Sequence, residues 1–240
     1  MIETITSKTN SKIKYACLLK TPKGRTEHKQ FLAEGYKTLE MGLEAKLVRV
    51  VFSLEKIKLP KDVQLYLVNE EVLKKLSSTV NPEGVVFICD YPSTQENFGN
   101  KIVYLDGVSD PGNMGTIIRT ALALGFDAVC YSSGSVSPYN DKVIAASKGA
   151  IFKIPVVELD LCVLKLKYQI IVSALSEGAI TPKEVKCKPN YVIVLGNESR
   201  GVSQESLNLA DLVVKIPMQS IDSLNVAIAG AILMYSLTNN

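Results

Sequence analysis

Residues 101–125 read KIVYLDGVSDPGNMGTIIRTALALG, an apolar run followed by a turn-forming loop and a helical pattern. Pro111 and Gly112 favour a turn, and Gly115 permits close approach of the backbone at the helix start. Arg119 is then expected about one turn into the helix, and Gly125 just beyond its end. A strand, a loop and a helix in this order form the repeating unit of a parallel α/β sheet. Taken alone, the loop is as typical of a structural turn as of a ligand site.

Further short apolar runs, several rich in Val and Ile, follow the first one and resemble strands buried on both faces of a parallel sheet. They are DAVCYS, FKIPVV, YQIIVSAL, YVIVLG and LVVKIP, at 127–132, 152–157, 168–175, 191–196 and 212–217. Between the first two, SPYNDKVIAASKG predicts a helix with Ser137 as its cap and Pro138 in its first position. The final pattern, SLNVAIAGAILMYSL at 223–237, is apolar almost throughout. It predicts a helix buried either in the core or against another subunit.

The first 90 residues have a different texture. We expect a helix capped by Ser11, and a second over 31–46 with Phe31, Leu32, Leu39 and Leu43 on one side. Three strands are predicted at 47–53, 63–68 and 84–90, with a helix at 70–78 between the last two. This pattern predicts a small α/β/α sandwich over residues 1–90. The stretch YPSTQENFGN at 91–100 has Pro, Gly and amides without an apolar period, and we interpret it as the linker.

Composition narrows the class of protein. The 240 residues are 47% hydrophobic and 21% charged, as in soluble globular proteins. We expect a cytoplasmic protein, because no apolar run is long enough to span a bilayer and MIETITSKTN lacks the apolar core of a secretory signal. The five cysteines are widely spaced without a CxxC pair, and His28 is the single histidine. These counts argue against a disulfide framework, a zinc site and a histidine-based triad, so no metal is expected.

Positive charge is concentrated in the first part of the chain. The whole sequence has a formal net charge of +3, whereas residues 1–90 carry 15 basic and 11 acidic side chains. No acidic residue interrupts the basic run of Lys8, Lys12, Lys14, Lys20, Lys23 and Arg25. Such a run is equally consistent with a surface that lines a phosphate backbone and with an ordinary solvated helix face.

Polar residues gather in three loops that each follow a predicted strand. The loops are SDPGNMG at 109–115, NESRG at 197–201 and MQSIDSLN at 218–225. Because ligands bind beyond the carboxyl ends of the strands in open parallel sheets, the three loops predict one shared site. Neither GxGxxG nor GxxxxGK[ST] is present, so dinucleotide and P-loop binding lack their usual sequence support.

The three stretches LDGVSDPGNMGTIIRTALALGFDAV, IVLGNESRGVS and IPMQSIDSLNVAIAGAI resemble, in this order and spacing, the three motifs of a known enzyme family. The family is that of the SpoU (TrmH-type) RNA 2′-O-ribose methyltransferases, of the SPOUT superfamily. The first 40 residues also resemble its substrate-binding domain. The resemblance implies a parallel-sheet SPOUT domain with a C-terminal trefoil knot at 101–240, preceded by a small α/β RNA-binding domain at 1–90. It further implies bound S-adenosylmethionine and a homodimer in which both subunits contribute to each active site.

The same resemblance assigns roles to individual residues. The implied catalytic residues are Asn113, Arg119, Glu198 and Asn225. The implied cofactor-binding residues are Leu195, Gly196, Asn197, Gly201, Ile216, Met218, Ser223 and Leu224. For RNA binding we expect Lys8, Lys12, Lys14, Lys23 and Arg25 from the basic run. One departure concerns Ser220, which stands where the family commonly has glycine, in a loop one residue shorter; this affects the expected path of the cofactor-binding loop.

The chemistry of methyl transfer agrees with these residue types. A methyl group on a sulfonium is already activated, so the protein must position the ribose hydroxyl and stabilise the developing alkoxide. Arg119 is often assigned as general base in the family, yet a guanidinium stays protonated, which makes a phosphate clamp the physically easier role. Glu198 would then orient Arg119 or Asn113, or else cap nearby backbone amides.

We therefore expect an enzyme that methylates a ribose 2′-hydroxyl of structured RNA. Ribosomal RNA is favoured over transfer RNA by family analogy. Two alternatives stay open, a tRNA 2′-O-methyltransferase and a non-catalytic RNA-binding module of the same fold. A nucleotide-dependent oxidoreductase is disfavoured because its fingerprint loop is missing.

Overall fold

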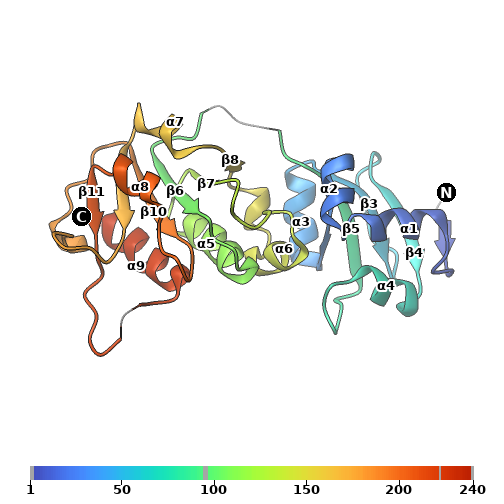
Figure 1. The fold of residues 1–240 in the computed structure, drawn as a ribbon. Helices are drawn as coiled ribbons and strands as arrows, with labels where there is room; N and C mark the ends of the chain where they lie inside the picture. The colour runs from blue at the N-terminus through green and yellow to red at the C-terminus, as the bar shows by residue number, and fades with distance from the viewer. Residues whose placement is uncertain (1–2, 94–96, 222, 239–240) are drawn as a thin grey trace. The chain divides into compact units, whose positions relative to one another are not determined.

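A computed structural model describes residues 3–93, 97–221 and 223–238. The chain forms two compact units, one of residues 1–93 with 139–153 and one of residues 94–138 with 154–240 (Figure 1). The linker predicted at 91–100 includes residues 94–96, which lie outside the described residues. Residues 139–153, within the predicted C-terminal domain, belong to the first unit. The domain limits at 90 and 101 remain a prediction.

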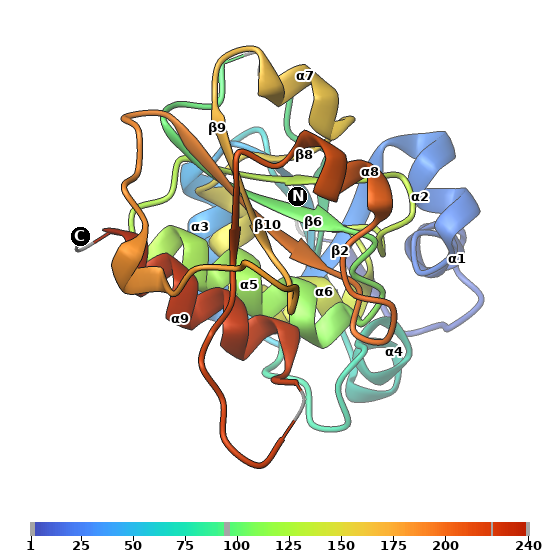
Figure 2. The same cartoon turned by 60° about the vertical axis from the view of Figure 1, so that its left-hand side comes forward.

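The second unit is built on a six-stranded parallel sheet in the order β11-β9-β10-β6-β7-β8. Figure 2 labels β6, β8, β9 and β10 of this sheet. Its strands are β6 (Lys101–Asp106), β7 (Ala128–Tyr131), β8 (Val156–Glu158), β9 (Gln169–Ser173), β10 (Tyr191–Gly196) and β11 (Leu212–Val214). These confirm the predicted parallel sheet. β8 begins later than the run FKIPVV because Ala150–Phe152 form the 3-10 helix η1 and Pro155 has no amide to donate to a ladder.

Helices cover both faces of this sheet. They are α5 (Pro111–Ala123), α7 (Leu161–Lys165), α8 (Gln204–Leu209) and α9 (Val226–Thr238), with the 3-10 helix η2 (Pro182–Glu184). α5 and α9 pack side by side on one face (Figure 2). Apolar residues of α7 and α8 pack on the other face, against buried residues such as Ile102 and Val192. No helix among the described residues has the length and hydrophobicity to cross a bilayer.

The helix α5 begins earlier than predicted. Asp110 is its N-cap, with a side-chain oxygen that accepts from the Asn113 amide at 2.8 Å, and Pro111 occupies the first position. Gly115 therefore lies inside the helix, and Arg119 lies about two turns from the start. The helix ends as predicted, since Gly125 has a φ of 71° just beyond the last turn.

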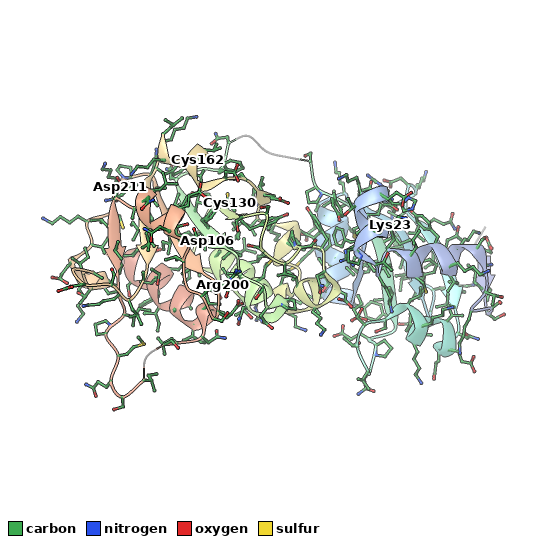
Figure 3. All side chains as sticks on the ribbon, in the orientation of Figure 1. Lys23, Asp106, Cys130, Cys162, Arg200 and Asp211 are labelled. Carbon is green, nitrogen blue, oxygen red and sulfur yellow. The ribbon has the colours of Figure 1, made fainter. Side chains whose placement is uncertain are left out.

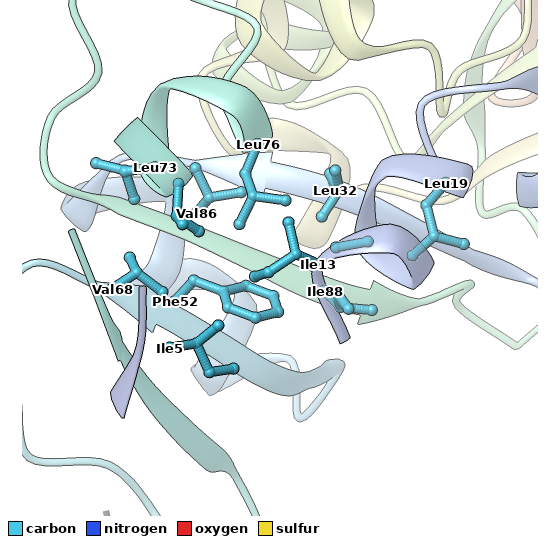
Figure 4. Packing of buried hydrophobic residues seen from close by; sticks show 12 residues of the cluster. Ile5, Ile13, Leu19, Leu32, Phe52, Val68, Leu73, Leu76, Val86 and Ile88 are labelled. Carbon is cyan, nitrogen blue, oxygen red and sulfur yellow. The ribbon is translucent and has the colours of Figure 1, made fainter. Parts of the chain in front are cut away.

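The first unit has a mixed five-stranded sheet in the order β1-β4-β3-β5-β2. Its strands are β1 (Glu3–Ile5), β2 (Gln30–Glu34), β3 (Val48–Ser53), β4 (Gln64–Val68) and β5 (Val85–Asp90). Its helices are α1 (Ser11–Leu18), α2 (Pro22–His28), α3 (Tyr36–Glu44), α4 (Glu70–Leu76) and α6 (Asp141–Ser147). Residues of α1 and α4 pack on one sheet face in the cluster drawn in Figure 4. The small α/β domain is thus present.

The helix predicted over 31–46 is wrong in its first part. Phe31 and Leu32 lie in β2, where Phe31 is paired with Cys89 of β5. Gly35 has a φ of 93°, a conformation that suits glycine and interrupts a helix, so α3 starts at Tyr36.

Two predicted caps are also corrected. Asn10 caps α1 in place of Ser11, and Asn140 caps α6 in place of Ser137. In both cases the Asn side-chain oxygen accepts the amide two residues further on, at 2.9 Å. This bond satisfies a backbone donor that the helix itself leaves free.

Candidate active site

Two loops meet at the carboxyl ends of the neighbouring strands β6 and β10. Leu195 pairs with Leu105 and Gly196 with Asp106, so both strands end at the same level of the sheet. After β6 the chain continues to β7 on one side of the pair, and after β10 it continues to β11 on the other side. The pair is therefore a switch point of the sheet topology. Crevices at such points are the usual ligand sites of open α/β sheets. Figure 3 labels Asp106 and Arg200, one from each side of the pair.

Asn197 ties the two loops together. Its side-chain nitrogen donates to the Gly107 carbonyl at 2.8 Å, and its side-chain oxygen accepts from the amides of Ser199 and Arg200. Asn197 and Gly201 also exchange backbone hydrogen bonds and close the NESRG loop. The loop conformation is therefore held by internal bonds.

The Glu198 carboxylate is the hub of the site. It accepts four hydrogen bonds, from the amide and hydroxyl of Ser109, the amide of Asp110 and the side-chain nitrogen of Asn113, at 3.0 to 3.2 Å. Burial raises the pKa of this carboxyl, but the bonds from Asn113 and the backbone amides outweigh it and lower the pKa to about 2. Glu198 is therefore ionised at neutral pH. It both bonds Asn113 and caps backbone amides, whereas the expected alternative, a bond to Arg119, is not formed among the described residues.

The third motif joins the same network. The Asn225 side-chain nitrogen donates to the Asn113 side-chain oxygen at 2.9 Å. The Asn225 side-chain oxygen accepts from the amides of Ala227 and Ile228 and so caps α9. Asn113, Glu198 and Asn225 are thus brought together from the three motifs.

Arg119 is not part of this network. It lies on α5, is exposed, and makes no hydrogen bond or ion pair with any residue of the described ranges. It stands six positions after Asn113, which places the two side chains on different faces of the helix, about 120° apart. The structure therefore brings together three of the four predicted catalytic residues, without Arg119.

A pocket of about 420 Å³ opens beside the network, at the carboxyl ends of β9, β10 and β11. It is lined by all eight predicted cofactor-binding residues, namely Leu195, Gly196, Asn197, Gly201, Ile216, Met218, Ser223 and Leu224. Glu198 also lines it, so network and pocket are contiguous. Sequence reasoning missed Ser173, Ala174 and Leu175, which lie at the end of β9 and just beyond it and line the same pocket. Their place at the carboxyl end of the strand predicted at 168–175 was the available signal.

Ser109 and Asp110 are further residues that sequence reasoning did not assign. They supply three of the four hydrogen bonds to Glu198. Ser109 also accepts from the Asn197 side chain at 3.3 Å. The signal for both was their position between β6 and the start of α5.

The departure at Ser220 has a conformational consequence. Ser220 has a φ of 63°, in the left-handed region that favours glycine. This chain therefore keeps a glycine-like backbone at this position with a serine side chain.

The predicted RNA-binding residues differ in their surroundings. Lys8 pairs with Glu71 at 3.0 Å and Lys12 with Glu3 at 2.5 Å, both at the surface, and Lys14 and Lys23 are exposed. Figure 3 marks Lys23.

Arg25 is a correction to that set. It is only 4% exposed, and its guanidinium donates to the Lys20 carbonyl at 2.8 Å beyond the end of α1. A guanidinium used in this way stabilises the segment between α1 and α2 and offers no surface to an RNA phosphate, contrary to the expectation from sequence.

The described residues hold no cluster of three or more Cys, His, Asp and Glu side chains that could bind a metal ion.

Fold and site together define a parallel α/β protein with a cofactor-sized pocket and a polar network at the switch point of its sheet. Residues 100–235 match the family model of the SpoU rRNA methylase family, and residues 10–86 match that of the MRM3-like substrate binding domain. The chain belongs to the SpoU rRNA methylase family.

Relatives that match nearly the whole of this chain support the same family. The chain is 34% identical to the 23S rRNA (guanosine(2553)-2′-O)-methyltransferase RlmP of Bacillus subtilis, over 97% of this chain and 98% of that protein. A solved AdoMet-bound rRNA methyltransferase from Sinorhizobium meliloti is 26% identical with a TM-score of 0.89, covering 99% and 98% of the two chains. A solved RNA 2′-O ribose methyltransferase is 29% identical with a TM-score of 0.82, covering 98% of each.

Proposed function

We propose that this protein transfers a methyl group from S-adenosylmethionine to a ribose 2′-hydroxyl of ribosomal RNA. The observation that carries the proposal is the hydrogen-bonded group of Asn113, Glu198 and Asn225, which borders the pocket of the eight predicted cofactor residues. These three residues come from the three motifs by which the sequence resembles RNA 2′-O-ribose methyltransferases. Names of relatives favour ribosomal over transfer RNA. We propose that the reaction takes place in the cytoplasm, because ribosomal RNA is found in the cytoplasm.

The pocket fits the proposed cofactor. Its volume of about 420 Å³ lies in the range of roughly 300 to 1,000 Å³ usual for small-ligand sites. Leu195, Ile216 and Leu224 provide apolar walls for a purine, and the loop backbone at 196–201 provides hydrogen-bonding groups. When bound, S-adenosylmethionine supplies a methyl group already activated by its sulfonium. We propose that the knot implied by the resemblance surrounds this pocket.

Glu198 acts as a positioning residue. A carboxylate whose pKa is about 2 is a poor proton acceptor at neutral pH, because a general base works best with a pKa near the operating pH. Its ionised form instead fixes the Asn113 side chain, whose oxygen is engaged by Asn225. Asn113 then lies at the N-terminal end of α5, where the helix dipole favours a developing negative charge.

Arg119 supplies the permanent positive charge, and we propose that it does so for the site of a second subunit. Arg119 is exposed and makes no hydrogen bond or ion pair with the network among the described residues, as expected if another copy receives it. α9 also presents an apolar face in which Ile228 is 53%, Ile232 37% and Tyr235 63% exposed. Their spacing of four and three residues places them on one side of the helix. A homodimer through this face buries apolar surface that a monomer leaves in water.

The homodimer is tested by sedimentation. Wild-type protein at micromolar concentration should sediment as a dimer, and Ile232→Asp should sediment as a monomer. Leu166→Asp is the control, because Leu166 is 89% exposed on a different element and should leave the dimer intact. A wild-type monomer would remove the shared-site proposal.

The reaction is tested with tritiated S-adenosylmethionine and unmodified ribosomal RNA. Label should enter the RNA in an alkali-resistant dinucleotide, because a 2′-O-methyl group blocks hydrolysis of the adjacent phosphodiester. Label in a base, or in transfer RNA only, would contradict the proposed substrate. Mapping 2′-O-methyl positions in cells with and without the protein would identify the nucleotide.

A further inference from the structure

A second groove lies in the first unit, and none of its lining residues is assigned to cofactor or catalysis. Its volume is about 480 Å³, within the range of roughly 300 to 1,000 Å³ usual for ligand sites. Phe52 and Ile88, two members of the core cluster in Figure 4, form part of its lining from the sheet. Lys12 and Tyr15 of α1 line it from the helix side. The groove therefore lies at the edge of the region in which α1 covers the sheet.

Aromatic rings from both sides border the groove. Tyr66 of β4 is half-buried, and its ring stacks on the buried Phe52 with a centroid separation of 5.6 Å and a plane angle of 27°. Tyr15 of α1 is also half-buried and meets His28 edge-on at 5.1 Å. Because their neighbours already hold these rings in place, little side-chain entropy is lost when a ligand binds. Proteins that bind single-stranded nucleic acid use such rings as stacking surfaces for bases.

A pre-oriented amide adds hydrogen-bonding capacity. The Gln30 side-chain oxygen accepts from the Tyr15 hydroxyl at 2.6 Å, and its nitrogen donates to the Asp90 carboxylate at 2.7 Å. Arg49 in turn holds that carboxylate at 2.6 Å and balances its charge. Gln30 has one more N–H and one more oxygen lone pair than these bonds use. An adjacent donor and acceptor on a fixed amide match the edge of a nucleobase.

Positive charge lies at the same groove. The Lys12 ammonium is 4.3 Å from the centre of the Tyr66 ring and pairs with Glu3 at the surface. Because exposed ion pairs are weak, a phosphate can take the place of Glu3. Lys14 is exposed on the same helix. The groove thus combines rings, an amide edge and a cation, which together match a nucleotide rather than an apolar peptide.

We infer that this groove binds an unpaired nucleotide of the RNA substrate, with its base against the tyrosine rings, its edge at Gln30 and its phosphate at Lys12. The inference rests on the proposed function for the identity of the ligand as RNA. It adds that the recognised RNA is single-stranded at this point, because a base inside a duplex cannot reach the rings.

Binding of the full-length protein to a fluorescein-labelled single-stranded RNA hexamer tests the inference, with a duplex of equal length for comparison. Tyr66→Leu keeps apolar bulk but removes the stacking ring, and we expect affinity to fall about 5- to 150-fold, the usual worth of one stacked base. Tyr66→Phe keeps the ring and should bind nearly as wild type does. Gln30→Leu should weaken binding at a temperature where the variant is folded, because the change also removes the bonds to Tyr15 and Asp90 and lowers stability.

The charge is tested separately. Lys12→Ala should lower the slope of log affinity against log salt by about 0.7, as expected for one phosphate contact on a single strand. Lys74→Ala is the matched control, since Lys74 also makes a surface ion pair on a helix, with Glu70, but does not line the groove. Wild-type affinity in folded Tyr66→Leu and Gln30→Leu, or a wild-type preference for the duplex, would overturn the inference.

Methyl transfer separates this inference from the proposed function. With ribosomal RNA as substrate, Tyr66→Leu should raise KM and leave kcat largely unchanged, because the groove binds RNA and takes no part in the chemistry. Active wild-type protein with groove variants of unchanged KM and hexamer affinity would refute the groove alone. Wild-type protein that binds the hexamer through the groove but transfers no methyl group would refute the proposed function alone.

Discussion

Replacing Glu198 with Gln tests the role of its ionised carboxylate most directly. The substitution keeps the size of the side chain but removes the charge and replaces one acceptor oxygen with an NH2 donor. Glu198 accepts from the Ser109 and Asp110 amides and from the Asn113 side chain. The NH2 group of Gln would therefore lie opposite N–H groups that also need an acceptor. At least one of these bonds is then lost, either from Ser109 or from Asp110 and Asn113, because a single amide oxygen cannot serve both sides of the carboxylate.

The magnitude follows from the pKa. The carboxyl has a pKa of about 2 in the folded protein against an ordinary value of 4.5. At about 1.36 kcal/mol per unit of pKa, this difference between the two pKa values corresponds to at most about 3.4 kcal/mol of stability. Glu198 is exposed, so solvent screening reduces the effect, and we expect a loss of about 1 to 1.5 kcal/mol at pH 7.

The pH dependence has a defined sign. Because the folded pKa is depressed, the contribution is fully present above pH 4.5 and is lost as the pH falls towards 2. Urea unfolding of wild type and Glu198→Gln between pH 7 and pH 3 should therefore give free energies that differ most at pH 7. The difference should decrease by more than half by pH 3.

Glu177→Gln is the matched control, because Glu177 is an exposed carboxylate of the same unit with no hydrogen bond among the described residues. It should be as stable as wild type throughout. A Glu198→Gln loss that stays constant from pH 7 to pH 3 would refute the electrostatic reasoning, since a steric defect has no such dependence. Equal stability of wild type and variant at pH 7 would refute the claim that the hydrogen bonds to the Glu198 carboxylate stabilise the protein.

Three further substitutions test the backbone and Arg119. Ser220→Gly should raise the free energy of unfolding by up to about 1 kcal/mol in urea, because glycine tolerates a φ of 63°, whereas the neighbouring Gln219→Gly should lower it. Gly196→Ala should cost about 1 to 3 kcal/mol by calorimetry, since its Cβ would lie 2.3 Å from the Gly201 backbone; Gly134→Ala, which meets nothing within 4 Å, should be tolerated. Arg119→Ala should abolish methyl transfer and change cofactor affinity only a few-fold by calorimetric titration, and equal loss of both would assign the residue an architectural role.

Predictions from sequence succeeded where the signal is local. The run YVIVLG coincides with β10, residue for residue, because a strand buried on both faces needs consecutive apolar side chains. Gly125 ends α5 as predicted, because a positive φ at that point selects glycine. The segment at 31–46 failed because Phe31 and Leu32 fit a helical period as well as a strand, and pairing with β5 decides between them.

The sequence by itself determined the strands of the second unit, its helices α5 and α9, the order of its three polar loops and the family to which the chain belongs, since these depend on residues close together in the chain. Only the tertiary structure decided that Glu198 receives its hydrogen bonds from residues 85 to 89 positions earlier, and that Asn225 reaches Asn113 across 112 positions. It also placed residues 139–153 in the first unit and buried Arg25. Such contacts arise when the sheet aligns the ends of β6 and β10, and no local pattern of side chains specifies that alignment.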